Sequence, residues 1–385
     1  MTHPYDALDA DGLRRRPLLK WRAYDDDVLP LWVADMDFPV ATPIREALKA
    51  FADGDTFGYP EWTGIPGLRE AVADRLARRQ GWTVDPEAIW ITPGTVAGLY
   101  TAVKAFAAQG DGVVAPTPVY PPFRLATENQ GRTFQSVDLR DDGEGYRLDE
   151  GALDAAITPS SRLLMLCHPH NPTGRVFDVN ELETLASRVL DHRLFVVSDE
   201  LHADLNFGPT HTPFASLSPE IAKRTVTLIG PTKAFNLAGL KIGFAIAEDP
   251  DVLARFKAAA FGVAMPAPAV SQWGALAAVR DADAWFEDTL AYLKGNRDHV
   301  AARVAAMPGV RHHAPEATYL AWLDFRDTPL AEDPAGLLRD RARLALNDGA
   351  SFGPAGAGFA RLNFATSRGI VDDALDRIER ALREA

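Results

Sequence analysis

Residues Thr225–Phe244 have the sequence TVTLIGPTKAFNLAGLKIGF. The β-branched run Thr225–Ile229 predicts a buried strand, which Gly230 and Pro231 end. Lys233 follows at once, so its amine is expected just beyond the end of that strand. Burial and nearby positive charge lower the pKa of such an amine and suit it to Schiff-base chemistry. Most lysines are exposed, however, so a surface lysine in a loop is the alternative for this segment.

Length, composition and charge restrict the class of protein. The chain has 385 residues, of which 47% are hydrophobic and 24% are charged, as in globular proteins of two or more domains. The net charge of -13 argues against binding to nucleic acid or to an anionic membrane, because both need a basic surface. No apolar run approaches the roughly 20 residues of a membrane span. We therefore expect a protein that binds neither nucleic acid nor membranes.

The single cysteine and the N-terminus bear on the cellular compartment. Cys167 lies in the apolar run Leu163–Cys167, where a buried structural thiol is expected rather than a nucleophile. No intramolecular disulfide can form, which is compatible with a reducing compartment. The first residues, MTHPYDALDADGL, are acidic and lack the apolar segment of a signal peptide. We expect a cytoplasmic protein.

From residue 89 onward, short apolar runs alternate with helical patterns. Such strands predict a mostly parallel α/β sheet that is covered on both faces. Besides Thr225–Ile229, the expected strands are residues 89–92, 112–115, 133–137, 163–167, 194–197 and 244–247.

The pattern changes near residue 280. A long helix at 283–306 is followed by strands at 318–325 and 361–364 and by helices at 334–346 and 371–382. This mixture predicts a smaller α+β domain. We therefore expect three parts, which are an N-terminal arm at 1–40, a large domain at 41–280 and a small C-terminal domain at 281–385.

Ligands of parallel α/β sheets bind at the carboxyl ends of the strands, so the turns after the predicted strands are candidate binding residues. Gly94 and Thr95 follow the first strand and open a helix, whose free N–H groups and positive dipole end suit a phosphate. A plain strand–helix turn is the alternative. Tyr120 lies in a stiff, proline-rich turn and offers a flat ring face.

Two further turns carry polar side chains. The amide of Asn171, in the turn HPHNPTG at 168–174, can hydrogen-bond a ligand oxygen. The two histidines of that turn have no third metal ligand nearby, so no metal site is expected. Asp199 follows the strand at 194–197, and a buried carboxylate is costly unless it is paired. It either faces a protonated ring nitrogen or caps a helix.

Two segments near the N-terminus remain ambiguous. Residues 29–39, LPLWVADMDFP, form either an irregular arm packed on the core or part of a pocket, in which Ala34 and Asp35 would contact a substrate. Residues 57–67, FGYPEWTGIPG, form a loop whose aromatic side chains either pack or bind.

Taken in order, the elements GT, PVY, NPTG, SDEL-H and TK resemble those of fold-type I pyridoxal phosphate (PLP) enzymes in the aminotransferase class I/II group. The resemblance covers nearly the whole chain and implies the α/β PLP-dependent transferase fold. It implies that Lys233 is the Schiff-base lysine and that Asp199 pairs with the pyridinium nitrogen. It also implies that Asn171 bonds the ring hydroxyl and that Tyr120 stacks on the ring. Lys233, Asp199 and Tyr120 are then the expected catalytic residues.

The resemblance further implies contacts to the phosphate, the substrate and a second subunit. Arg361 is expected to bind the substrate carboxylate as a bidentate fork. Tyr59 is expected to reach the cofactor phosphate of a neighbouring subunit, which implies a homodimer with shared sites. The other expected cofactor contacts are Gly94, Thr95, Val96, His202, Thr232 and Lys241.

Three residues depart from the common aminotransferase pattern. His202 stands in place of a tyrosine, Gly230 in place of a serine and Lys241 in place of an arginine. Together with WVADMDF, FGYPEW, TKAFNLAGLK and GASFGPAGAGFARLNFA, these residues resemble the MalY/PatB subfamily of cystathionine β-lyases.

The subfamily resemblance implies α,β-elimination. L-cystathionine, or a related cysteine S-conjugate, would give a thiol such as homocysteine, pyruvate and ammonia. The alternative is a PLP-dependent aminotransferase that moves an amino group from an amino acid to a 2-oxo acid. A further alternative is a regulatory or binding protein that retains the fold.

Overall fold

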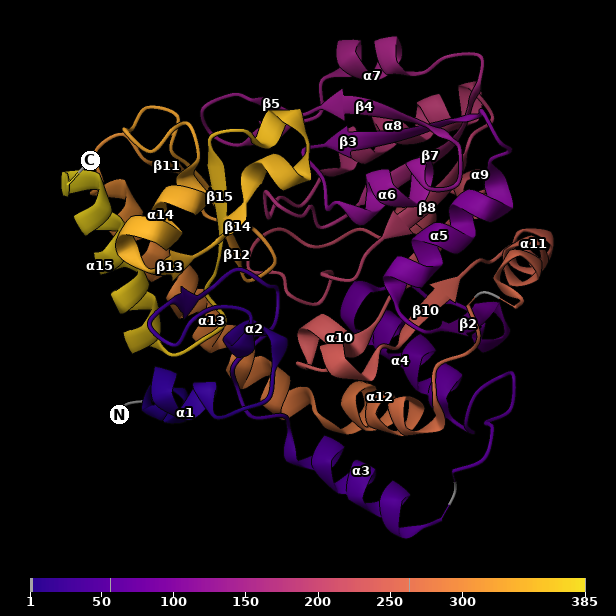
Figure 1. Ribbon diagram of the computed structural model, residues 1–385. Helices are drawn as coiled ribbons and strands as arrows, with labels where there is room; N and C mark the ends of the chain where they lie inside the picture. The colour runs from indigo at the N-terminus through magenta and orange to yellow at the C-terminus, as the bar shows by residue number, and fades with distance from the viewer. Residues whose placement is uncertain (1–2, 56, 263, 385) are drawn as a thin grey trace.

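The computed structural model describes residues 3–55, 57–262 and 264–384. Its centre is a seven-stranded sheet in the order β2-β10-β9-β8-β7-β3-β4 (Figure 1). The strands are β2 (Ile89–Thr92), β3 (Gly112–Thr117), β4 (Thr133–Asp138), β7 (Ser161–Cys167), β8 (Phe195–Asp199), β9 (Thr225–Ile229) and β10 (Gly243–Ile246).

The sheet is parallel except for one strand. β10 runs antiparallel to both neighbours, β9 and β2, whereas the other neighbouring pairs are parallel. The predicted mostly parallel α/β sheet is therefore confirmed. Because six strands share one direction, their carboxyl ends meet at a single edge, where the amino end of β10 also lies.

Helices cover both faces of the sheet, because alternate strand residues point to opposite sides. Leu99, Val103 and Phe106 of α5 pack with α6 and α11 on one face, around Val113, Met165 and other buried strand residues. The opposite face packs against α8 and α9, and the β2–β10 end packs against α4 and α12. The helices of this part are α3 (Thr42–Asp53), α4 (Leu68–Gln80), α5 (Thr95–Phe106), α6 (Pro122–Glu128), α7 (Glu150–Ala156), α8 (Val179–Asp191), α9 (Pro219–Ala222), α10 (Pro231–Ala234), α11 (Pro250–Ala260) and α12 (Ala269–Asp281).

Short elements connect these layers. They are the hairpin of β5 (Arg140–Asp141) and β6 (Tyr146–Arg147) and the 3₁₀ helices η2 (Pro86–Ala88), η3 (Phe214–Leu217) and η4 (Ala238–Leu240).

The C-terminal part contains a four-stranded antiparallel sheet in the order β11-β12-β15-β14. The expected helix 334–346 is too long. α14 ends at Ala342 because Arg343 adopts a left-handed conformation with φ 54°, and a strand begins at the next residue. The elements are α13 (Asp283–Ala305), β11 (Arg311–His312), β12 (Leu320–Asp324), α14 (Pro334–Ala342), β13 (Leu344–Ala345), β14 (Asn347–Asp348), η5 (Gly349–Phe352), η6 (Pro354–Gly356), β15 (Phe359–Asn363) and α15 (Arg368–Glu384).

The N-terminal residues pack against the C-terminal part (Figure 1). They comprise η1 (Pro4–Ala7), α1 (Ala10–Arg14), α2 (Leu19–Arg22) and β1 (Leu29–Pro30), and β1 pairs in parallel with β13. The ammonium of Lys20 donates to Asp37 Oδ2 at 2.7 Å, and both side chains are 1% exposed. Trp21 Nε1 donates to Asp37 Oδ1 at 2.7 Å. The buried ion pair and this hydrogen bond together hold Asp37 against α2 and so fix the course of the chain between them.

Candidate active site

The turns that follow the parallel strands meet at one edge of the sheet. Asp199 is the last residue of β8, and Lys233 lies on α10 directly after β9. Asn171 follows β7 and Tyr120 follows β3, and the backbone N–H of Tyr120 donates to the carbonyl of Asn171 at 3.2 Å. The four residues implied to surround the cofactor ring thus lie on adjacent turns.

Lys233 is half-buried, and its amine hydrogen-bonds within the protein. Its Nζ donates to the carbonyl oxygen of Ala34 at 2.5 Å, and Tyr319 Oη donates to the same oxygen at 3.1 Å. Burial lowers the pKa of Lys233 to about 8, and the positive charge of Arg361 acts in the same direction. The carboxylate of Asp35 opposes this shift. An amine with this pKa is partly neutral near pH 8, so it can act as a base or nucleophile.

Asp199 is a buried carboxylate, 7% exposed. Its Oδ1 accepts a hydrogen bond from the backbone N–H of Leu201 at 3.3 Å. Burial raises the pKa of Asp199 to about 7, and the neighbouring Glu200 adds to the rise. No α-helix begins at the turn after β8, so Asp199 does not cap a helix.

Glu200, the neighbour of Asp199, is fully engaged elsewhere. It accepts hydrogen bonds from Ser198 Oγ at 2.8 Å and from the backbone N–H of Phe214 at 3.0 Å. The ring of His211 contacts it through Nε2 at 2.8 Å. Of the two carboxylates at the end of β8, only Asp199 is left to meet a ligand.

Arg361 is held on β15 by groups from the other parts of the site. Its Nη1 donates to Asn171 Oδ1 at 2.8 Å, and its Nη2 donates to the carbonyl oxygen of Trp32 at 3.2 Å. The guanidinium lies 4.9 Å from the ring centroid of Phe352. Its Nε has no hydrogen-bond partner among the described residues, and burial lowers the pKa of Arg361 to about 10. Such a buried cation suits a carboxylate ligand.

The segment around Ala34 packs against Lys233 and β15, so it is a packed arm beside these residues, and its place in a pocket stays a prediction. Asn363 Nδ2 donates to the carbonyl oxygens of Val33 and Asp35, at 2.7 Å each. Burial raises the pKa of Asp35, and Lys233 is the charge that most strongly opposes this rise. The carboxylate of Asp35 therefore lies within electrostatic reach of the lysine.

His202 is the departure whose pKa responds to the charge of Lys233. Its side chain is 5% exposed, and Nδ1 has no partner among the described residues. Burial lowers the pKa of His202 to about 3, and Lys233 and Arg361 act in the same direction. A neutral imidazole with a free nitrogen is thus available to a ligand at neutral pH.

The other two departures lie around the expected phosphate position. Thr95 is the first residue of α5, and a Cβ added at Gly94 would meet no atom within 4 Å. At Gly230 an added Cβ would lie 3.0 Å from the carbonyl oxygen of Ile242. The backbone of β10 therefore crowds the position where the common pattern has a serine. Lys241 is exposed, with a left-handed backbone at φ 48°.

Four of the expected cofactor contacts have no partner among the described residues that tests their role. Tyr59 is 104% exposed and Val96 is 38% exposed. Thr232 is half-buried beside Lys233. Burial raises the pKa of Tyr120, and Asp199 adds to that rise, so its hydroxyl stays protonated. The cofactor roles of all four residues stay predictions.

The described residues contain no group of three or more His, Cys, Asp or Glu side chains arranged to hold a metal ion. The described part of the chain also has no helix long and apolar enough to cross a membrane. Cys167 is buried, and its thiol donates to the carbonyl oxygen of Pro169 at 3.5 Å. Burial raises the pKa of that thiol.

Three residues of the site were missed by the sequence analysis: Trp32, Tyr319 and Asn363. Asn363 carried a usable signal, because it lies two residues from Arg361 on the same strand and so on the same face. Tyr319 and Trp32 gave none, because their contacts depend on segments that are distant in sequence.

The residues present fit pyridoxal phosphate. Asp199 has no ion-pair partner among the described side chains, as a group that receives a protonated ring nitrogen requires. His202 Nδ1 is buried and unpartnered, and the amino end of α5 is open at Gly94. The fold and this donor set define an α/β protein of the type I PLP-dependent transferase class.

Comparisons with known proteins agree. Residues 26–378 match the family described as aminotransferase class I and II. Cystathionine beta-lyase PatB of Bacillus subtilis (strain 168) is 38% identical over 371 residues, which cover 92% of this chain and 93% of PatB. Protein MalY of Escherichia coli (strain K12) is 31% identical over 365 residues, which cover 93% of this chain and 92% of MalY.

A solved structure gives the same result. Cystalysin from Treponema denticola, described as containing a pyridoxal 5'-phosphate cofactor, superposes with a TM-score of 0.93 and 29% identity. The match covers 100% of both chains. The chain belongs to the aminotransferase class I and II family, and its resemblance to MalY and PatB is confirmed.

Proposed function

We propose that this protein is a PLP-dependent carbon–sulfur β-lyase. It cleaves L-cystathionine, or a related cysteine S-conjugate, to a thiol such as homocysteine, pyruvate and ammonia by α,β-elimination. The observation that carries the proposal is the position of Lys233. Its buried amine, with a pKa lowered to about 8, lies within electrostatic reach of Asp199 and Arg361. The similarity to relatives named cystathionine beta-lyase over almost the whole chain supports the same reaction.

The cofactor site is assigned as follows. Asp199 pairs with the ring nitrogen, Asn171 bonds the ring hydroxyl through its amide nitrogen and Tyr120 covers the ring. His202 offers its free Nδ1 to the same ring. The phosphate is assigned to the amino end of α5 at Gly94, Thr95 and Val96, together with Thr232 and Lys241.

When bound, the cofactor supplies a carbonyl that combines with amines and a ring that withdraws electrons from the substrate α-carbon. The proton of that carbon is taken by the neutral amine of Lys233. The resulting ammonium donates to the carbonyl oxygen of Ala34, which lies 2.5 Å from Nζ. Asp35, next to that carbonyl, stabilises the positive charge. The proton is thus held at one defined atom while the sulfur leaves as a thiolate.

Arg361 orients the substrate. Among the residues that the structure describes, its Nε has no partner and its two outer nitrogens donate only to neutral oxygens, those of Asn171 and Trp32. A substrate carboxylate therefore supplies the negative charge that this buried guanidinium lacks. Ala34 and Asp35, in the segment that Arg361 also contacts through Trp32, are assigned to the substrate.

Product analysis tests the reaction. The purified protein with PLP is incubated with L-cystathionine alone and, separately, with an amino acid plus 2-oxoglutarate. We expect free thiol and pyruvate in equal amounts without any added keto acid. Glutamate formation without thiol release would instead establish an aminotransferase. A protein that neither binds PLP nor forms product would favour a regulatory role.

We also propose a homodimer in which Tyr59 completes the partner's site. Tyr59 is fully exposed, and other large apolar side chains are exposed in the same sequence region and on α12. The rings of Trp62 and Phe261 lie 6.3 Å apart. A group of exposed aromatic side chains is typical of an interaction surface. The other exposed apolar side chains of this surface are Phe57, Met265 and Trp273.

Mixing of inactive variants tests the shared site. Lys233→Ala and Tyr59→Ala subunits, denatured and refolded together, are expected to recover activity above either variant alone. A mixed dimer contains one site with an intact lysine and an intact partner tyrosine. The matched control mixes Lys233→Ala with Asp199→Asn, whose defects lie in the same chain's site, and should recover nothing. Equal activity in both mixtures would exclude a shared site.

The domain limits and the compartment are part of the same proposal. Residues 1–40 form an arm that serves the small domain and the site, 41–280 form the large cofactor-binding domain, and 281–385 form the small domain. The pairing of β1 with β13 supports the placement of the arm. We place the protein in the cytoplasm, with which its single, unpaired cysteine is compatible.

A further inference from the structure

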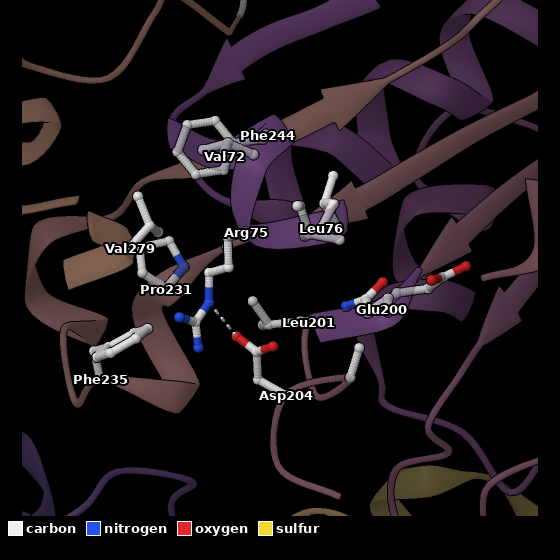
Figure 2. A pocket seen from close by; sticks show the side chains of 14 residues that line it. Val72, Arg75, Leu76, Glu200, Leu201, Asp204, Pro231, Phe235, Phe244 and Val279 are labelled. Carbon is white, nitrogen blue, oxygen red and sulfur yellow. Dashed lines mark hydrogen bonds and ion pairs between the residues drawn. The ribbon is translucent and has the colours of Figure 1, made fainter. Parts of the chain in front are cut away.

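Arg75 is a buried charged residue that none of the proposed reaction steps uses. It lies on α4 and is 5% exposed. Arginine is rarely buried to this extent unless it is paired. Figure 2 shows its guanidinium between the carboxylate of Asp204 and the ring of Phe235. A buried cation so close to the turns of the active site requires a physical explanation.

Two carboxylates from distant segments neutralise Arg75. Its Nε donates to Asp204 Oδ2 at 3.1 Å, and its Nη1 donates to Asp283. Asp204 lies five residues beyond Asp199, in the turn that also carries His202. Asp283 is the first residue of α13, the helix that leads into the C-terminal part. Arg75 therefore joins the Asp199 turn to α13 through one rigid group.

Two aromatic rings complete the contact. The guanidinium carbon lies 4.8 Å from the ring centroid of Phe235 and 5.3 Å from that of Phe286. Phe235 is fully buried and follows Lys233 by two residues, whereas Phe286 belongs to α13. Cation–π contacts are stronger when the cation is removed from water, as it is here. Arg75 thus also contacts the turn that carries Lys233.

The turn that carries Lys233 is incompletely packed on the side that faces Arg75. A cavity of about 30 Å³ lies between Arg75, Gly230 and Pro231 (Figure 2). Arg75 Nη2 has no hydrogen-bond partner among the described residues. Atoms that line a cavity lack packing partners on that side, so the position of the turn depends more strongly on the contacts that it does make. The contact between Arg75 and Phe235 is one of them.

We infer that Arg75 is a positioning residue, which holds Asp199 through the Asp204 turn and Lys233 through Phe235, and ties both to α13. The expected effect on catalysis rests on the proposed function. The positioning of the two turns by Arg75 does not depend on which reaction the protein catalyses. Movement of α13 is then transmitted to the two reacting groups together.

A neighbouring arginine provides a matched control. Arg79, one helical turn further along α4, pairs with Glu287 and lies 4.9 Å from the ring of Phe286. Both of these partners belong to α13. Arg79→Met therefore weakens the tie between α4 and α13 and leaves the two active-site turns untouched, whereas Arg75→Met releases all three segments.

The test compares these variants by hydrogen–deuterium exchange of the protein purified with PLP. Arg75→Met is expected to accelerate exchange in peptides covering residues 199–206 and 230–237 about tenfold relative to Arg79→Met. The pH midpoint of the visible absorbance of bound cofactor should shift in Arg75→Met only. With L-cystathionine, kcat should fall about tenfold and KM should change less than about twofold, because orientation is lost rather than affinity.

Equal exchange of both peptides in Arg75→Met and Arg79→Met would overturn the inference and leave Arg75 a structural residue. If Arg75→Met does not fold, Arg75→Lys and Asp204→Asn decide. Both variants should exchange faster than the wild-type protein in the peptide covering residues 199–206. If both variants exchanged at the wild-type rate there, the inference would be overturned. If Arg75→Met exchanged faster but the wild-type protein released no thiol from L-cystathionine, the proposed function would be refuted and the inference about Arg75 would stand.

Discussion

Lys233→Ala is expected to reduce thiol release from L-cystathionine by at least about 10³-fold, because the variant has no base at the substrate α-carbon. The structure supports so large an effect. The amine is buried, its pKa is lowered to about 8 and it hydrogen-bonds Ala34 at 2.5 Å. The charged groups that act on this amine are the carboxylates of Asp35 and Asp199 and the guanidinium of Arg361. With a pKa of about 10, Arg361 stays protonated near pH 8, so it cannot replace Lys233 as the base. Pyruvate formation and the visible absorbance of bound cofactor measure the result.

The control for this prediction is Lys223→Ala. Lys223 is exposed at the end of α9, and its removal tests the loss of a lysine without the loss of the buried amine. It should retain wild-type activity and absorbance. If Lys233→Ala kept more than a tenth of the activity, Lys233 would not be the base.

The second large effect is expected for Asp199→Asn, and its sign differs between two measurements. An amide cannot pair with a protonated ring nitrogen, so the rate with bound cofactor should fall by about 10²-fold or more. In the cofactor-free protein, the same change removes a buried carboxylate without a cation partner. The free energy of unfolding should therefore increase.

The size and pH range of this increase follow from the pKa shift. Burial raises the pKa of Asp199 from 3.8 to about 7, so the folded protein binds the proton more tightly than the unfolded chain does. The stability gained from protonation is complete below pH 4 and is lost as the pH rises through 7. At pH 8, Asp199→Asn should stabilise the cofactor-free protein by roughly 4 kcal/mol, and near pH 4 by almost nothing.

Urea unfolding at both pH values measures this difference. The control is Asp53→Asn, at an exposed carboxylate near the end of α3, which should change stability little at either pH. A destabilised Asp199→Asn protein at pH 8 would mean that Asp199 has a cationic partner in the absence of cofactor.

The sequence by itself determined the large sheet and most of its site. The runs that predict strands match all seven strands of the sheet, because nearly continuous apolar segments are stable only when both faces are buried. Since ligands bind at the carboxyl ends of such strands, the positions of Tyr120, Asn171, Asp199 and Lys233 could be inferred before any contact was known. The family pattern then added Arg361.

Local sequence was less informative in the C-terminal part. The helix expected at 334–346 ends at Ala342, because the pairing of β13 with β1 outweighs the helical propensity of the residues after Arg343. No local pattern indicates a partner strand that lies more than 300 residues away. The same reason hid the hydrogen bonds of Asn363 to Val33 and Asp35.

Only the tertiary structure decided how Lys233 is held. Its partners are the carbonyl oxygen of Ala34, the carboxylate of Asp35 and, through Phe235, the guanidinium of Arg75. All three belong to segments that are distant from Lys233 in the sequence and that the fold brings together. Backbone carbonyls are present at every residue, so sequence cannot mark the one that accepts the hydrogen bond of Lys233. The sequence identified the lysine, whereas its lowered pKa and fixed position come from burial and from distant contacts.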